Sequence, residues 1–404
     1  MLNKLSPYLS FRYFLYFFAF IAGWPCVFFL MGWLPHYTVN YLILFILVAF
    51  FIVTKNKYRL PSPIAILLVL QITVWGIYSI IHGLDTSYFT RILLLCITYM
   101  FLEMQLSGER LGFVKTYNLW LVFQAVAGSI GFILVLVGIL QPIFEFRELD
   151  MRPGYFFGLF TTNTYLGGLV RNAGFYDEPG TLAFWGMYAL IINKLFVDNK
   201  KMEILLIFGL ISTLSLAYFI QIAMYAFFFY KEKCSKLLPY IAVFLFGLIL
   251  ISSFNERMED AIFGRMKYNE ETGTLAGDNR SQMMKVCWDI FKTSPIVGQG
   301  ARHLIEISIE RRVFVGANPN FTLACDGLIG QIIVWSPFFL LFGLRRYDKK
   351  YGWVFWILIV GFLQRPYDST QLLYPLMSFT IVLHAYLQAK NVLKNNESKQ
   401  ELLA

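Results

Sequence analysis

The stretch "RNAGFYDEPGTLAFW" (171–185) places an arginine and two adjacent carboxylates just before an apolar run. Asp177 or Glu178 is positioned to cap a helix whose first residue is Pro179. The N-terminus of such a helix attracts anions through its free amides and its dipole, and Arg171 lies just ahead of it. A carboxylate in that setting can act as a general base. The simpler alternative is a capping acid with Arg171 as its salt-bridge partner.

A second stretch, "GDNRSQMMKVCWDIFKTSPIVGQG" (277–300), has a similar composition. Asp278 or Asn279 can cap a short helix, which puts Arg280 at another helix N-terminus. "SP" then ends the helix and "GQG" permits a turn. The alternative is an amphipathic surface helix whose arginine reaches water along its aliphatic stem. Three apolar residues recur at near-helical spacing: Met284, Trp288 and Phe291.

Both stretches belong to a very apolar chain. Its 404 residues are 58% hydrophobic and 18% aromatic, and its mean hydropathy is +0.59. A soluble domain of this length is far more polar, so the sequence predicts an integral membrane protein. The net charge of +9 comes mostly from basic residues that flank apolar runs, which indicates topology and not nucleic-acid binding. The five cysteines form no CxxC pair and no Cys/His cluster, so we expect no metal site and no disulfide framework.

The apolar runs have the length of membrane-spanning helices. They occupy 13–34, 38–54, 63–82, 89–106, 118–147, 179–196, 237–254, 320–344, 352–364 and 371–389. One further run, 203–230, has "NKK" before it and "KEKCSK" after it, and basic flanks of this kind lie in the cytoplasm. A segment with both ends on one side crosses an even number of times. We therefore expect a pair of short helices, or a re-entrant segment, that turns near Ser212–Ser215, where hydroxyls bond the freed backbone groups.

This reasoning predicts an all-α membrane protein with about twelve transmembrane helices, both termini in the cytoplasm, and a single polytopic domain over 1–404. Two large loops, about 148–178 and 255–319, then lie on the outer face. Of the 34 Lys and Arg, 20 fall on the cytoplasmic side, and 11 of the 14 outer ones are arginine. Because arginine binds phosphate in a bidentate way, the outer excess predicts an anionic partner there.

The order of the motifs resembles the O-antigen polymerase and O-antigen ligase superfamily (Wzy-type polymerases) over about residues 150 to 370. The resemblance rests on "RNAGFYDEP" before a helix, the "STLS" break, "R…W…F…SPIVGQG" in a long loop, and "NPNFTLACDGLIG" opening the next span. It implies a GT-C-like fold and a metal-independent, cofactor-free glycosyltransferase in the bacterial inner membrane. Its donor and acceptor would be undecaprenyl-pyrophosphate-linked oligosaccharides, polymerised on the outer face into O-antigen, capsule or exopolysaccharide. A chain-length regulator protein is a candidate partner.

The resemblance assigns Arg171 and Arg280 to the pyrophosphate, whose charge they would stabilise. Glu178 is the first choice of base for the acceptor hydroxyl, with Asp177 behind it. Further substrate-binding candidates lie mostly in the second loop: Arg265, Asn279, Arg302, Asn318 and Asn320.

Three alternatives remain. Ligases of the superfamily have "HN" where this chain reads "VGANPNFTLACDG", without histidine, which weakens the ligase alternative; His303 is the one candidate, and a lone loop histidine is more often a surface residue. A transporter or lipid-linked oligosaccharide flippase would carry function near the midplane, whereas acids within these spans are scarce. An assembly protein would not need arginines and acids at helix mouths.

Overall fold

The computed structural model describes residues 7–21, 26–33, 36–54, 59–107, 109, 111–147, 153–158, 161–163, 171–233, 268–269, 274–275, 281–310, 318–365 and 371–401. The first half contains α1 (Pro7–Ile21), α2 (Val27–Leu30), α3 (His36–Thr54), α4 (Ser62–Ile81), α5 (Thr86–Leu106) and α6 (Gly112–Leu136). A second group is α7 (Pro179–Ile192), the π-helical turn η1 (Asn193–Val197), α8 (Lys200–Gly209), η2 (Leu210–Thr213), α9 (Leu216–Tyr230) and η3 (Lys231–Lys233). The rest comprises α12 (Ser281–Thr293), α13 (Ala301–Glu310), α14 (Phe321–Gly343), η5 (Leu344–Arg346), α15 (Lys350–Gln364) and α16 (Leu373–Glu401).

The described chain is a helical bundle with apolar helices of membrane-spanning length. Five segments are long and apolar enough to cross a bilayer: Ser62–Ile81, Thr86–Leu106, Gly112–Leu136, Pro179–Val197 and Phe321–Arg346. Shorter apolar helices lie at Phe11–Ile21, Val39–Val53, Leu216–Tyr230 and Lys350–Leu363. These helices confirm a membrane protein, while the count of twelve spans stays a prediction. The expected span at 237–254 lies outside the described residues.

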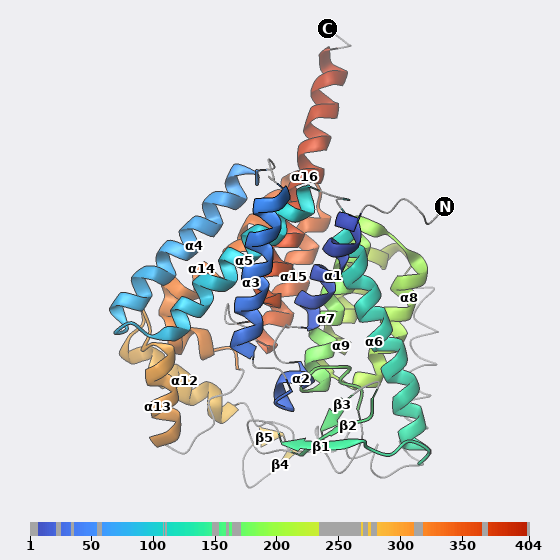
Figure 1. Cartoon of the computed structure of the whole chain (residues 1–404), viewed down its shortest axis with the longest axis vertical. Helices are drawn as coiled ribbons and strands as arrows, with labels where there is room; N and C mark the ends of the chain where they lie inside the picture. The colour runs from blue at the N-terminus through green and yellow to red at the C-terminus, as the bar shows by residue number, and fades with distance from the viewer. Residues whose placement is uncertain are drawn as a thin grey trace.

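Polar elements gather at one end of the bundle, which we call the loop end. Figure 1 shows α12, α13 and the strands there, at the bottom of the view, whereas the last turns of α16 project from the opposite end. The two long loops predicted on a common face thus contribute elements to the same end. Which side of the membrane that end faces remains a prediction.

Three predicted runs differ from the helices that form. The first run, 13–34, is not one span, because α1 ends at Ile21 and Cys26 forms a β-bridge with Tyr176. The run 118–147 ends as helix at Leu136, and its last residues form a strand. The last helix continues beyond 389 to Glu401.

The predicted all-α class is confirmed, and small sheets at the loop end are an addition that the sequence did not predict. Strand β1 (Phe144–Arg147) pairs antiparallel with β2 (Pro153–Phe156), which pairs with β3 (Thr161–Asn163). Strands β4 (Tyr268–Asn269) and β5 (Thr274–Leu275) pair separately. The "FEFR" of β1 alternates aromatic and charged residues, which is the strand period and a signal that the apolar run obscured.

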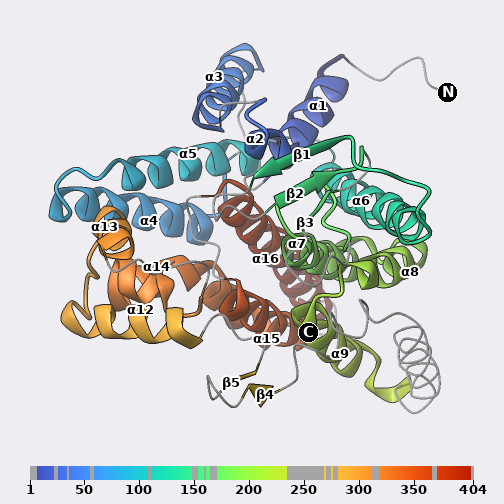
Figure 2. The same ribbon diagram turned by 90° about the horizontal axis from the view of Figure 1, so that it is seen from below.

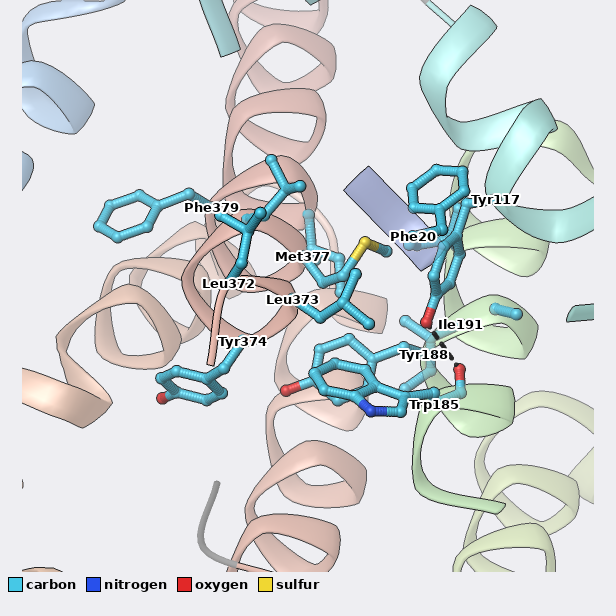
Figure 3. Close-up of a cluster of buried hydrophobic side chains, with 14 of the residues drawn as sticks. Phe20, Tyr117, Trp185, Tyr188, Ile191, Leu372, Leu373, Tyr374, Met377 and Phe379 are labelled. Carbon is cyan, nitrogen blue, oxygen red and sulfur yellow. Dashed lines mark hydrogen bonds between the residues drawn. The ribbon is translucent and has the colours of Figure 1, made fainter. Parts of the chain in front are cut away.

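The centre of the bundle is built on α7 and the first half of α16. Thirteen residues of α7 are buried, all except Gly180, as expected of a helix that is apolar on every side. Figure 3 shows Trp185, Tyr188 and Ile191 facing Leu373 and Met377. On the other side, the Tyr117 hydroxyl donates to the Trp185 carbonyl over 3.1 Å. The mouth of α7 is therefore carried by a rigid core.

The predicted hairpin is confirmed. Helices α8 and α9 are separated by the single turn η2 and by Leu214, whose φ of 47° is left-handed. Lys200, at the start of α8, donates to the Tyr230 hydroxyl at the end of α9 over 3.0 Å, so both ends of the hairpin lie together. Ser212 and Thr213 hydroxyls each donate over 2.7 Å to the carbonyls of Gly209 and Leu210. Side chains thus bond backbone groups that the break frees.

Candidate functional site

The "RNAG" segment docks on the break of the α8–α9 hairpin. The Asn172 backbone N–H donates to the Ser212 carbonyl over 3.0 Å. The Asn172 side-chain NH₂ donates to the Ser212 hydroxyl, also over 3.0 Å. The Asn172 side-chain oxygen accepts from the Gly174 N–H over 2.9 Å. Two motifs that are 40 residues apart in sequence therefore form one unit. Arg171, the residue before, is only 7% exposed and is held in this buried segment.

Gly174 and Phe175 connect this segment to two neighbouring elements. Gly174 has a φ of 57°, and a Cβ there would come within 2.5 Å of the Gln124 side chain on α6. The Gln124 side-chain oxygen accepts from the Phe175 N–H over 2.9 Å. The Phe175 carbonyl in turn accepts from the Val27 N–H over 2.7 Å, next to the bridge between Cys26 and Tyr176. The segment that leads into α7 is therefore bonded to α6 on one side and to the start of α2 on the other.

The predicted helix mouth forms as expected, but its capping differs. Glu178 is the N-cap residue and Pro179 opens α7. The Glu178 side chain makes no capping bond; its backbone carbonyl accepts from the Thr181 N–H over 3.0 Å. Asp177 accepts from the Thr181 hydroxyl over 2.7 Å and from the Glu178 N–H over 2.8 Å. Asp177 therefore organises the first turn, and the Glu178 carboxylate makes a different contact.

That contact is with Arg365, which follows the last residue of α15. Its Nη1 donates to the Glu178 carboxylate over 2.7 Å and to the Thr181 hydroxyl over 3.2 Å. The guanidinium lies directly against Gly180, where a Cβ would come within 2.5 Å of it. The Arg365 side chain is 9% exposed and that of Glu178 is 24% exposed. An arginine and a carboxylate thus meet at the N-terminus of α7, with the carboxylate partly open to solvent.

The second loop packs against α14. Asn318 donates to the Cys287 sulfur over 3.2 Å and accepts from the Asn320 N–H over 3.0 Å. Asn320 donates to the Met284 carbonyl over 3.0 Å. Both predicted substrate-binding amides therefore make bonds that join α12 to the start of α14. The helix predicted here is confirmed as α12, although its buried face is Cys287, Ile290 and Phe291, while Trp288 is exposed.

The "SPIVGQG" and "ACDGLIG" motifs pair with each other. Helix α14 is broken at Gly327, whose φ is 66° and ψ is −167°. Across the break, the Leu328 and Ile329 amides donate to the carbonyls of Pro295 and Ile296 over 2.9 and 3.2 Å. In return, the amides of Gln299 and Gly300 donate over 3.0 and 2.8 Å to the carbonyls of Ala324 and Cys325. The expected turn at "GQG" is confirmed, since Gly298 and Gly300 both have positive φ.

A buried ion pair lies beside this break. Arg91 of α5 donates to the Asp326 carboxylate over 2.8 Å, and both side chains are essentially inaccessible. The Tyr88 hydroxyl donates to the same carboxylate over 3.0 Å, and the Arg91 guanidinium lies 4.5 Å from the Trp75 ring centroid. Acids within the spans were expected to be scarce, yet this one is fully engaged with a cation. Charged residues inside a membrane bundle are costly unless paired in this way.

The structure brings some of the predicted site residues together and separates others. Asp177 and Glu178 share the mouth of α7, with Arg171 in the segment that leads to it. Arg302 lies apart on α13, with its side chain 79% exposed and bonded to Glu306 over 3.3 Å. Figure 2 shows α12 and α13 beside α4 and α14, while α6, α7 and α8 lie on the other side of α16. Arg265, Asn279 and Arg280, with Asp278, lie outside the described residues.

Arg365 and the pair formed by Arg91 and Asp326 were not among the predicted site residues. Each has a signal in the sequence, because an ionisable residue within or at the end of an apolar run is costly without a partner. "FLQRP" places Arg365 at the end of one run, and "FTRILLLC" and "ACDG" place the other two inside runs. The sequence does not reveal their partners, because Glu178 is 187 residues from Arg365 and Asp326 is 235 residues from Arg91. In comparisons with known proteins, no family model and no curated sequence matches this chain.

Proposed function

We propose that the protein is a membrane glycosyltransferase that polymerises lipid-pyrophosphate-linked oligosaccharide units at the loop end of the bundle. The observation that carries the proposal is the contact of Arg365 with Glu178 and Thr181 at the N-terminus of α7. A helix N-terminus favours negative charge and disfavours a buried cation, so a guanidinium there needs anionic partners. The Arg365 guanidinium is therefore suited to bind the Glu178 carboxylate and an incoming anionic group at the same time.

The chemistry uses the two charges in different ways. The hydroxyl oxygen of the acceptor sugar forms a bond to the anomeric carbon of the donor, and the bond from that carbon to the pyrophosphate oxygen breaks. The lipid pyrophosphate leaves with the electron pair, and arginine stabilises the charge that develops on it. The acceptor proton goes to Glu178, because an ionised carboxylate accepts hydrogen bonds only and has partly open access.

Arg171, Arg280 and Arg365 are the proposed pyrophosphate ligands. Arg171 is held in the buried segment that leads to the α7 mouth, and Arg280 comes just before α12 in the sequence. Arg365 is the addition that the structure suggests to this set. Bidentate recognition of phosphate requires the planar fork of arginine, so lysine at these positions would keep the charge and lose the geometry.

The deciding experiment gives the purified protein, in liposomes, an undecaprenyl-pyrophosphate-linked repeat unit. A ladder of products without any added lipid core supports polymerisation. Transfer only when lipid A-core is supplied would identify a ligase instead. Neither product, with movement of the lipid-linked unit across the bilayer, would identify a flippase.

Single substitutions test the assigned roles. Glu178→Gln should lower turnover by at least about 100-fold while the protein still binds the lipid-linked donor, because the amide cannot take the proton although its oxygen can still accept a hydrogen bond from Arg365. Arg171→Ala, Arg280→Ala and Arg365→Ala should each abolish product, and Arg280→Lys should fail as well. Arg345→Ala is the matched control, since Arg345 lies beyond the far end of α14, against Phe342. Long products from the Arg171→Ala and Arg280→Ala double variant would contradict the assignment.

Transport is a further candidate, ranked below the polymerase and the ligase, and one observation favours it. Transporter sites are commonly built where membrane helices are interrupted, and α14 is interrupted beside a buried ion pair. Within the described residues, however, Asp326 is bonded to Arg91 and Tyr88, and the freed amides of α14 are bonded to the 295–296 carbonyls. The break is closed by protein groups, so transport stays below both glycosyl-transfer reactions.

A further inference from the structure

A band of five aromatic side chains runs from α6 to the sheet at the loop end. Its members are Phe123, Phe175, Phe28, Trp33 and Phe144. Successive ring centroids are 6.4, 5.7, 5.9 and 5.7 Å apart, and the first three pairs are stacked. We call this set the aromatic band. It is a continuous surface feature assembled from four separate segments of the chain.

The band is open at both of its ends. Phe123 is 45% exposed on α6, a helix of membrane-spanning length and composition. Trp33 is 51% exposed and Phe144 47% exposed at the other end. Apolar exposure continues between α6 and β1, through Val137, Ile139 and Ile143. Exposed apolar side chains therefore lead from α6 to the edge of the sheet, with Gln141 as a polar residue among them.

The sheet itself has two chemically different faces. Phe144 pairs with Phe156 across β1 and β2, and the Trp33 ring meets both of them edge-on. Glu145, the next residue of β1, is exposed and points to the opposite face, because side chains alternate along a strand. An aromatic face beside a charged face is the arrangement that suits the boundary between hydrocarbon and headgroups, where tryptophan is enriched.

We propose that the aromatic band rests at the hydrocarbon–headgroup boundary of the bilayer, so that β1 lies in the membrane interface with Phe144 toward lipid and Glu145 toward water. The occupant of this face is the lipid of one leaflet. The argument rests on continuity with α6 and does not depend on the proposed reaction. It sets the depth of the α7 mouth, because the band includes Phe175, three residues before Glu178, and Phe175 is bonded to Val27.

Spin labels on adjacent residues of β1 test this placement. Phe144→Cys and Glu145→Cys are labelled separately in a background with Cys96→Ser and Cys234→Ser, since Cys96 is the one described cysteine that is not buried and Cys234 lies outside the described residues. In bilayers of phosphatidylethanolamine and phosphatidylglycerol, we measure collision with oxygen, which partitions into lipid, and with a water-soluble nickel chelate. The ratio of oxygen to nickel accessibility should be several-fold higher at position 144 than at position 145.

Equal ratios at the two positions would overturn the proposal. Shielding of position 144 from both reagents would also overturn it, because that result means that a protein surface covers the band. A second measurement avoids any effect of the label on folding. Lipids brominated near the headgroup should quench a part of the tryptophan fluorescence that Trp33→Phe removes, whereas Trp75→Phe, at a fully buried position, should leave the quenched part unchanged.

Discussion

Among the described residues, the break between α8 and α9 and the break within α14 are stabilised in different ways. At the α8–α9 break, hydroxyl groups and one asparagine bond the freed groups, and the asparagine belongs to the segment that leads to Glu178. At the α14 break, four backbone bonds hold the freed groups, and a buried ion pair lies beside them. Hydrogen bonds from neutral side chains predominate at the α8–α9 break, whereas backbone hydrogen bonds and an adjacent ion pair predominate at the α14 break.

The difference assigns the two regions different mechanical roles. Neutral side-chain bonds contribute about 1 kcal/mol each, so the segment from Arg171 to Glu178 is held by several modest contacts. The α14 break carries a buried charge that cannot lose its partner without a large cost. We therefore regard the α14 region as a fixed anchor for α12 and α13, and the α8–α9 region as the adjustable support of the proposed site.

Removing one charge of the anchor should produce the largest loss of stability. We expect Asp326→Ala to lower the free energy of unfolding by about 3–5 kcal/mol, because Arg91 is left buried without its carboxylate. Equilibrium unfolding in mixed SDS micelles measures this value. The control is the double variant Arg91→Met with Asp326→Ala, which should be more stable than Asp326→Ala alone because it removes the isolated charge. A double variant whose loss equals the sum of the two single losses would contradict direct pairing.

Crowding at the same break should give the next largest effect. A Cβ at Gly327 would come within 2.4 Å of the Ile296 carbonyl oxygen, and the φ of this residue is positive. We expect Gly327→Ala to cost about 1–3 kcal/mol in the same unfolding assay, since backbone is on the other side of the contact. Gly343→Ala, at the end of the same helix, meets no atom within 4 Å and serves as the matched control. A similar loss in both variants would mean that the break needs no glycine.

Features that depend on local sequence were predictable. The start of α7 at Pro179 follows from a capping acid and a proline, and the turn within 203–230 follows from basic flanks and a cluster of hydroxyls. The helix after Arg280 follows from periodicity. These features are set by neighbours within a few residues, so one sequence carries enough information.

Features that depend on pairing between distant segments were not predictable. Arg365 stands alone in its run, and nothing nearby shows that it meets Glu178. The strands after α6 were hidden because an apolar run of helix length extends into them. Likewise, "SPIVGQG" has the sequence of a loop and "ACDGLIG" that of a membrane span. Only the fold shows that the backbones of the two motifs are hydrogen-bonded to each other.

The adjustable support predicts a smaller and more local effect. Asn172→Ala should cost about 1–2 kcal/mol of stability, because the Ser212 hydroxyl loses one of its partners. Activity should fall further than stability does, since the segment from Arg171 to Glu178 would lose its register on the hairpin. Product formation at a temperature where the variant remains folded separates the two effects. Ser129→Ala is the control, because Ser129 also bonds Ser212 but lies on α6, outside the site segment. Equal losses of activity in both variants would remove the special role of Asn172.

Acid should weaken the contact that holds α13 and leave the contact between Asn172 and Ser212 unchanged. This is the smallest effect we expect. Asp85 caps α5 and accepts from the Arg302 N–H over 3.0 Å, which joins α13 to the bundle. Burial alone would raise the pKa of Asp85, but the amides of Ser87 and Arg302 outweigh it and hold the pKa below its usual value. A lowered pKa in the folded state means that Asp85 contributes stability above its unfolded pKa of about 3.9, and that this contribution is lost as the pH falls through the folded value.

The bonds between Asn172 and Ser212 are neutral, so the same fall in pH leaves them intact. Hydrogen exchange, corrected for its intrinsic pH dependence, should therefore rise in 301–304 below about pH 4 and stay constant in 172–174. Asp85→Asn keeps the cap on the Ser87 amide and removes the titrating group, so exchange in 301–304 should become independent of pH over this range. An acid-induced rise that persists in Asp85→Asn would place the titrating group elsewhere, and the contrast between an anchor held by charge and a support held by neutral bonds would then need another ionisable contact.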